Sequence, residues 1–179
     1  MNFYYIFIIQ GDFMVKIQKA IPEDALGIAI VNVYTWKTAY SGLIPNDFID
    51  SRIDRVIEIA DRNRRDIEKG NSFIVAKENN TVIGFAWYGK SRNEEFIDSG
   101  EIYALYVLSG FQGKGIGREI FDSCIGELKK EGYESLIINC LEGNKSMEFY
   151  KHMGGKVVGK SMDEIKGVHL TSDILLFAI

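Results

Sequence analysis

Residues 101–118 read EIYALYVLSGFQGKGIGR, and this stretch decides the fold class. After Glu101, its first part is apolar on both alternating faces, which is typical of a central strand covered on both sides. The next residues are rich in glycine, and from Ile116 an apolar residue recurs every four positions. The stretch therefore predicts a buried strand, a glycine-rich loop and an amphipathic helix over 116–131.

The glycine-rich loop predicts an anion-binding site. Small residues let consecutive backbone N–H groups point into one concavity, and the start of a helix adds partial positive charge. Two common nucleotide motifs are broken: Ile116 and Gly117 replace the Lys and Ser/Thr of a P-loop, and Arg118 fills the last glycine position of GxGxxG. What remains is Gln-x-x-Gly-x-Gly, formed by Gln112, Gly115 and Gly117. The alternative interpretation is a plain glycine-rich turn.

The rest of the chain alternates strand and helix patterns. Strands are expected over 15–20, 72–77, 81–89, 101–108, 135–141, 156–161 and 168–178, and helices over 22–38, 54–69, 116–131 and 144–152. This order predicts one mixed α/β domain over residues 14–179. Residues 1–13 are interpreted as a non-essential extension, because a complete domain could begin at Met14.

Composition argues against several classes of protein. A hydrophobic share of 46% in 179 residues is enough for one core and excludes disorder. The net charge of −4 argues against nucleic-acid binding, which needs a basic face. The apolar run 3–9 is far shorter than the roughly 20 residues of a membrane span, and no signal-peptide pattern surrounds it. Two cysteines build no disulfide framework, so a reducing, cytoplasmic setting is expected.

The loop motif after EIYALYV resembles the GCN5-related N-acetyltransferase (GNAT) superfamily, and the resemblance covers nearly all of the chain from Met14 onward. A second signature follows at the expected distance, where residues 144–150 read NKSMEFY. Its middle residues depart from the family pattern and Gly155 replaces an aromatic residue, but Asn144 and Tyr150 are kept. Within the superfamily, the chain is similar to PaiA-type spermidine/spermine acetyltransferases.

The resemblance implies a mixed, mostly antiparallel twisted sheet with helices on both faces and a splay between the fourth and fifth strands. Acetyl-CoA would lie in this gap as co-substrate, with no metal. By resemblance, the cofactor-binding residues are Leu105, Tyr106 and Val107 along the pantetheine arm, then Gln112, Gly113, Lys114, Gly115, Ile116, Gly117 and Arg118 around the pyrophosphate, and finally Asn144 and Lys151. A solvated surface lysine is an equal interpretation of Lys151.

The implied chemistry is direct attack of an amine on the thioester. An alkyl ammonium has a pKa of about 10.4, so it must lose a proton before it can attack. Glu101 is placed to accept this proton directly or through a water. The N–H of Val107, freed by the splay, would stabilise the oxyanion. Tyr150 would protonate the leaving thiolate. The alternatives are a strand-end surface glutamate for Glu101 and an aromatic core residue for Tyr150.

The acceptor is expected to be a polyamine, because the loops 38–50 and 88–100 carry several acids that would attract a cation. These acids are Asp47, Asp50, Glu94, Glu95 and Asp98. Solvated loop carboxylates are the alternative interpretation. Protein N-terminal or lysine acetylation, or a non-catalytic CoA sensor, are the alternative functions. The oligomeric state is left as either a monomer or a homodimer. Both cysteines are interpreted as packed thiols, and the two histidines as structural or surface groups.

Overall fold

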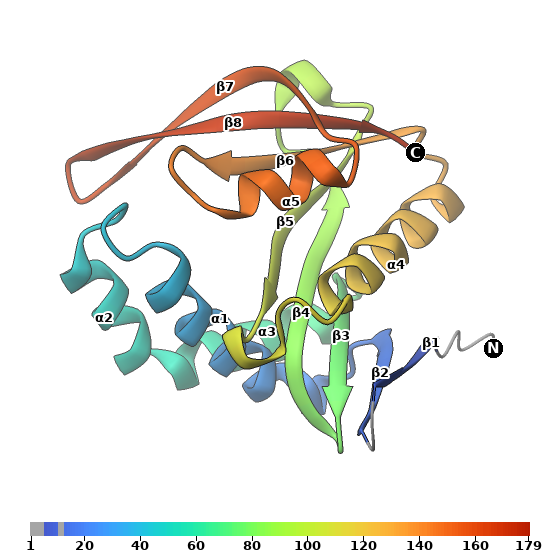
Figure 1. The fold of residues 1–179 in the computed structure, drawn as a ribbon. Coiled ribbons are helices and arrows are strands. Elements are labelled where there is room, and N and C mark those ends of the chain that lie inside the picture. The colour runs from blue at the N-terminus through green and yellow to red at the C-terminus, as the bar shows by residue number, and fades with distance from the viewer. Residues whose placement is uncertain (1–5, 11–12) are drawn as a thin grey trace.

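The sheet forms around β5 (Gly100–Val107), the strand that the sequence predicts to be central. The computed structural model describes residues 6–10 and 13–179, and within them eight strands form one sheet in the order β1-β2-β3-β4-β5-β6-β8-β7 (Figure 1). The other strands are β1 (Ile6–Gln10), β2 (Phe13–Lys19), β3 (Ser72–Glu78), β4 (Thr81–Lys90), β6 (Ser135–Leu141), β7 (Lys156–Ile165) and β8 (Val168–Ala178). Neighbouring strands are antiparallel except β5 and β6, which are parallel.

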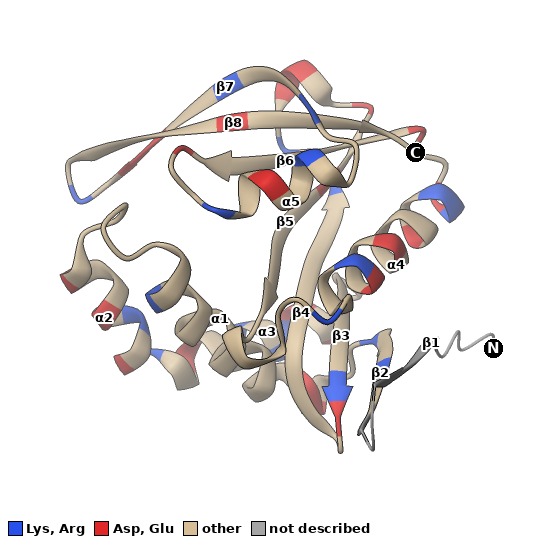
Figure 2. Ribbon diagram, viewed as in Figure 1, with Lys and Arg blue, Asp and Glu red and all other residues tan. Residues whose placement is uncertain are grey.

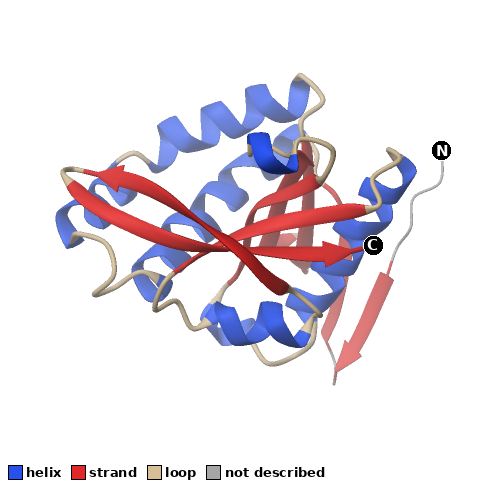
Figure 3. Ribbon diagram, turned by 90° about the horizontal axis from the view of Figure 1, so that it is seen from above, coloured by secondary structure: helices blue, strands red, loops and turns tan. Residues whose placement is uncertain are grey.

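Helices cover both faces of this sheet, as the resemblance implies (Figure 3). The helices are α1 (Ala25–Ala39), α2 (Asn46–Asp54), α3 (Val56–Glu68), α4 (Ile116–Lys130) and α5 (Ser146–His152). On one face, Ile28 and Val31 of α1 join a buried cluster with Val75 of β3 and Phe85 of β4. On the other face, α4 packs on a separate cluster that also contains Tyr150 of α5. The α/β architecture with two covered faces is confirmed.

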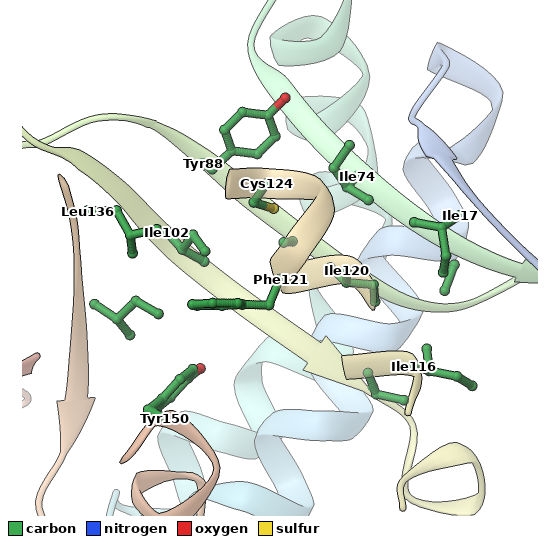
Figure 4. Close-up of a cluster of buried hydrophobic side chains, with 14 of the residues drawn as sticks. Ile17, Ile74, Tyr88, Ile102, Ile116, Ile120, Phe121, Cys124, Leu136 and Tyr150 are labelled. Atoms are coloured by element: carbon green, nitrogen blue, oxygen red, sulfur yellow. The ribbon is translucent and has the colours of Figure 1, made fainter. Parts of the chain in front are cut away.

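The apolar stripe of α4 holds this second cluster together. Its residues Ile116, Ile120, Cys124 and Leu128 are all at most 2% exposed, and α4 packs against β2 to β5. Figure 4 shows Ile116, Ile120 and Cys124 among the buried side chains of this cluster. Burying a side chain of this size contributes about 1.5–3 kcal/mol each, so the stripe anchors the helix firmly. Gly115 directly precedes α4 with φ of +80°, a left-handed conformation that favours glycine. The packing therefore fixes where the glycine-rich loop ends and the helix begins.

The predicted splay lies between β5 and β6, the fourth and fifth of the strands expected from the sequence. These strands pair only at Gly100 with Leu136 and at Glu101 with Ile137. Beyond those pairs β6 continues along β8, whereas β5 continues along β4. The divergence opens a gap along the second half of β5, and the predicted fold class is confirmed.

Some boundaries differ from the expectations. The segment 38–50, expected to be a loop, contains the first half of α2, because Pro45 fixes the start of the helix and Asp47 lies in its first turn. Only Ile49 of α2 is buried, so the helix carries little apolar periodicity for a sequence pattern to show. The last helix begins at Ser146 instead of 144, and β7 extends four residues beyond 161.

The extension predicted for residues 1–13 is described only in part. Residues 1–5 and 11–12 lie outside the described residues, while β1 pairs with the edge of β2 from Ile6 to Gln10. Whether the extension is dispensable stays a prediction, as does a single domain over 14–179. No helix in the described ranges is long and apolar enough to cross a membrane.

Candidate active site

A cavity of about 710 Å³ occupies the gap between β5 and β6. Its walls come from the second half of β5, from β6, from the glycine-rich loop with the start of α4, from α5, and from the C-terminal end of α1. This volume lies in the range of small-molecule sites. β4 and β5 each carry a single charged residue, at Lys90 and Glu101, whereas charges are frequent on α2 and α4 (Figure 2). The cavity thus lies beside a largely uncharged part of the sheet.

The predicted anion cradle forms one end of this cavity. Gln112, Gly113, Gly115, Gly117 and Arg118 all line it. Gly113 and Gly115 have φ of +74° and +80°, so the loop can turn its amides toward the start of α4. A side chain at Gly117 would project beside Phe149 without a close contact, so the glycine leaves space that a ligand can occupy.

Two residues of the predicted cradle do not bring their side chains to the cavity. Ile116 is 2% exposed and packs in the core below α4. Lys114 is not among the lining residues, and its Nζ lies 5.4 Å from the centroid of the Phe111 ring. The prediction for both residues is that their backbone amides bind the pyrophosphate, so the positions of their side chains do not test it.

The second half of β5 presents main-chain groups to the gap. Leu105, Tyr106 and Val107, which the resemblance places along the pantetheine arm, line the cavity. The N–H of Leu108 donates to the carbonyl of Ile83 at 2.9 Å, so Leu108 faces β4. Because successive residues of a strand present their N–H and C=O to opposite sides, Val107 and Leu105 face the gap. This orientation is compatible with the free donor at Val107 that the resemblance implies.

Asn144 and Lys151 have different surroundings. The Oδ1 of Asn144 accepts a 2.8 Å hydrogen bond from the backbone N–H of Ser146, which orients the side chain at the start of α5. Its Nδ2 keeps two donors, and Asn144 lines the cavity. Lys151 is not among the lining residues; its Nζ lies 3.5 Å from Oε1 of Glu148 on the exposed side of α5. The geometry therefore favours the surface interpretation of Lys151.

Tyr150 reaches the cavity from α5. It is 7% exposed, lines the cavity and points toward the sheet (Figure 4). Its ring contacts Phe149 edge-on at 5.3 Å between centroids. Burial raises the pKa of the Tyr150 phenol well above its usual value, with further increases from nearby Tyr106 and Cys140. The hydroxyl is consequently held protonated, the form that a proton donor needs.

Glu101 lies beside the cavity rather than in its lining. Its carboxylate is almost fully buried and accepts hydrogen bonds from the backbone N–H of Arg92 at 2.8 Å and from the guanidinium at 2.9 Å. Asn139, which does line the cavity, lies within 3.4 Å of the same carboxylate. The predicted base is thus in contact with the site through Asn139, while Arg92 occupies most of its acceptor positions.

Sequence reasoning missed several lining residues. Tyr40, at the end of α1, places its hydroxyl 3.1 Å from the hydroxyl of Tyr106 on β5, across 66 positions of sequence. Cys140 lines the cavity as a buried thiol, and burial raises its pKa to about 11. His152, expected to be a structural or surface group, also lines the cavity. Local spacing carries no signal for such contacts, since each depends on how distant elements meet.

A family model described as the acetyltransferase (GNAT) family matches residues 34–154, which include the cradle, β5 and Tyr150. The chain belongs to this family. It is 34% identical to YuaI of Bacillus subtilis, an uncharacterised N-acetyltransferase, over 88% of this chain and 89% of that protein. It is 27% identical to the L-amino acid N-acyltransferase MnaT of Escherichia coli, over 76% and 77% of the two chains.

A solved structure of PaiA N-acetyltransferase from Thermoplasma acidophilum, in complex with coenzyme A, shares the fold. Its TM-score is 0.73 at 20% identity, covering 92% of this chain and 99% of that chain. As a GNAT family member, the chain is an acetyl-CoA-dependent N-acetyltransferase. The cavity fits acetyl-CoA in this structure, because the glycine cradle, the open edge of β5 and the oriented amide of Asn144 line one continuous space. The described residues contain no cluster of three or more His, Cys, Asp or Glu that could hold a metal ion.

Proposed function

We propose that this acetyltransferase moves the acetyl group directly to a primary amine in the gap between β5 and β6. One observation carries the proposal: Val107, whose main-chain N–H points away from β4, and the phenol of Tyr150 both line the same cavity. Acetyl-CoA supplies a thioester carbonyl. The Val107 N–H would stabilise negative charge on the carbonyl oxygen, and Tyr150 would donate a proton to the departing sulfur.

The raised pKa of Tyr150 is compatible with this role. In water a phenol is about 1.5 pKa units weaker an acid than a thiol, so the proton transfer costs roughly 2 kcal/mol. Burial disfavours the tyrosinate, but it disfavours a thiolate in the same cavity for the same reason. The difference between the two groups therefore stays small enough for a transient step.

Glu101 is our candidate for accepting the proton of the ammonium. Its carboxylate accepts a 3.4 Å contact from the amide of Asn139, which lines the cavity. Because an amide cannot relay a proton and Glu101 lies roughly 20 Å along β5 from Val107, the proton would travel through a chain of waters. Arg92 must yield some of its contacts before Glu101 can act. Neutralising the buried carboxyl, as in Glu101→Gln, should lower kcat without weakening CoA binding.

A polyamine is our first candidate acceptor, as the sequence predicts. The PaiA structure has a similar fold, and the acids of the two expected loops support a cationic acceptor. Two of these acids are already paired: Asp47 with Lys166 at 2.8 Å, and Asp50 with Lys37 at 3.6 Å. None of the acids lines the cavity. The attraction would therefore act at long range rather than through contact.

A second candidate acceptor is an amino acid, and the surroundings of Arg52 favour it. Its guanidinium lies 3.9 Å above the Trp36 ring and donates to Oδ1 of Asn32 at 2.5 Å. Burial lowers the pKa of Arg52, and the nearby Tyr106 partly offsets this effect. No carboxylate among the described residues forms an ion pair with it. A carboxylate on the acceptor would supply that partner, and MnaT is named for amino acid acceptors.

Release of CoA thiol from acetyl-CoA tests these proposals with three acceptor sets: spermidine and spermine, L-amino acids, and peptides with a free N-terminus or lysine. Turnover with polyamines that survives Arg52→Ala supports the first candidate. Turnover with amino acids whose KM rises about tenfold in Arg52→Ala supports the second. Turnover with peptides alone indicates a protein acetyltransferase. CoA binding without turnover on any amine would contradict the enzymatic proposal and favour a CoA sensor.

The setting and assembly of the protein are also proposals. Both Cys124 and Cys140 are buried and free, which supports a reducing, cytoplasmic location. We keep monomer and homodimer as the two candidate assemblies, with no nucleic-acid or membrane partner. Sedimentation of the purified chain decides between the two assemblies.

A further inference from the structure

The buried carboxylate of Glu101 and the exposed guanidinium of Arg92 form an ion pair at the edge of the cavity. The Glu101 side chain is 3% exposed, whereas that of Arg92 is 59% exposed. The guanidinium approaches Glu101 at 2.9 Å through one terminal nitrogen and at 3.5 Å through Nε, while the backbone N–H of Arg92 gives a separate bond of 2.8 Å. A buried carboxylate needs a cation beside it, so the exposed arginine can leave when another cation takes its place.

Aromatic rings complete the surroundings of the guanidinium. The Cζ of Arg92 lies 4.0 Å from the centroid of the Tyr103 ring and 5.6 Å from that of Trp87. The two rings contact each other at 4.6 Å, and the Tyr103 hydroxyl donates to the carbonyl of Lys90 at 2.5 Å. These contacts hold the rings in place independently of Arg92. A carboxylate combined with ring faces is a typical site for an organic cation.

This cation site is continuous with the reaction cavity. Tyr103 and Asn139 both line the cavity, and both also contact the Arg92–Glu101 pair. The chain shifts register in this region: Trp87 pairs with Ala104 but Tyr88 pairs with Ile102, so Tyr103 is an extra residue in β5. This bulge turns Tyr103 beside Glu101 at the point where β5 leaves β6.

We propose that Glu101, Tyr103 and Trp87 form a subsite for the ammonium group of the acceptor, and that Arg92 is a displaceable cap that fills it when no acceptor is bound. The inference rests on the proposed function, because it names where the amine binds before transfer. Arg92 is a competitor for the subsite, not a catalytic residue. Its departure uncovers the carboxylate that must accept the proton.

Kinetics of Arg92→Ala test the cap. With the competitor gone, the KM for a cationic acceptor should fall about tenfold while the KM for acetyl-CoA is unchanged. An acceptor that is neutral at the assay pH, 2,2,2-trifluoroethylamine, should show no change in KM. Lys90→Ala is the matched control, since it removes a nearby exposed charge that does not contact Glu101. An unchanged or raised KM for the cationic acceptor in Arg92→Ala would overturn the proposal.

Methylguanidinium chloride provides a test that does not depend on turnover. By calorimetry it should bind CoA-loaded Arg92→Ala at one site, and it should bind the wild type and Lys90→Ala about tenfold more weakly. It should also compete with the acceptor. Binding without competition, or equal binding to all three proteins, would overturn the proposal. Binding to Arg92→Ala with no transfer to any amine would instead refute the proposed function and leave the cation subsite standing. If Arg92→Ala does not fold, Arg92→Lys serves instead, because it keeps the charge but loses the paired nitrogens of the guanidinium. Its KM should fall by a smaller factor, and an unchanged KM would contradict the proposed cap.

Discussion

The side chain of Gln112 donates a 2.8 Å hydrogen bond to the main-chain carbonyl of Val107. The bond joins the glycine-rich loop to the last residue of β5. Val107 presents the free N–H that we assign to the acetyl carbonyl, and Gln112 begins the cradle that we assign to the pyrophosphate. One side chain therefore sets the spacing between the two ends of the cofactor site.

Replacing Gln112 by Ala should loosen this spacing. A partly buried hydrogen bond such as this one contributes about 1 kcal/mol, so CoA binding should weaken by roughly fivefold. Calorimetric titration with CoA measures the change, with Gln18→Ala on β2 as the control. CoA affinity equal to that of the wild type would show that the bond does not organise the site.

Tyr150→Phe should remove the proton donor while keeping the packing of the ring. We expect kcat to fall about a hundredfold or more, with the KM for acetyl-CoA nearly unchanged. Tyr34→Phe, at an exposed position on α1, controls for loss of a hydroxyl. A kcat within a factor of two of the wild type would assign Tyr150 to the core alone.

The buried tyrosines should make the protein sensitive to alkali. Burial raises the pKa values of Tyr40, Tyr88 and Tyr150 above the ordinary value of about 10. Because the folded state holds these protons more tightly than the unfolded state, their stabilisation is complete below about pH 10 and is lost as the pH rises above it. The Tm should therefore fall steeply above about pH 10. Tyr88→Phe should make that fall shallower, and an identical pH profile would contradict the assignment.

A chain that begins at Met14 should fold and transfer acetyl groups. β1 adds one strand to the outer edge of β2, and three strands separate it from β5, which borders the cavity. Tm and kcat/KM of the truncated protein should lie close to those of the full chain. A chain that fails to fold would show that the first strand belongs to the domain.

The elements that the sequence predicted well are those whose signal is local. The four-residue period from Ile116 to Leu128 defined α4, and the strands expected over 72–77 and 81–89 match β3 and β4. The splay was different, because it came from the family resemblance rather than from any residue pattern. Its physical basis is that β6 pairs with β8 instead of following β5.

What the sequence did not predict are contacts between distant elements. Arg92 reaches Glu101 because a bulge in β5 and the loop after β4 meet, and neither has a distinct local pattern. Tyr40 meets Tyr106 only after α1 packs on the sheet. In the candidate site, spacing therefore predicted where the glycine-rich loop and the start of α4 lie, whereas the surroundings of Glu101 depended on tertiary structure.

Calorimetry with CoA on Gly117→Leu tests the central claim, that amides at the start of α4 bind the pyrophosphate. A side chain at Gly117 meets only Phe149 at ordinary contact distance, so the fold should persist while the cradle is filled. Gly126→Leu, on the same helix at a position where an added Cβ would meet no atom within 4 Å, is the control. We predict that wild type and Gly126→Leu bind CoA and that Gly117→Leu binds it at least about a hundredfold more weakly, while all three bind pantetheine equally. CoA binding by Gly117→Leu at wild-type affinity, or no binding by the wild type, would contradict the account.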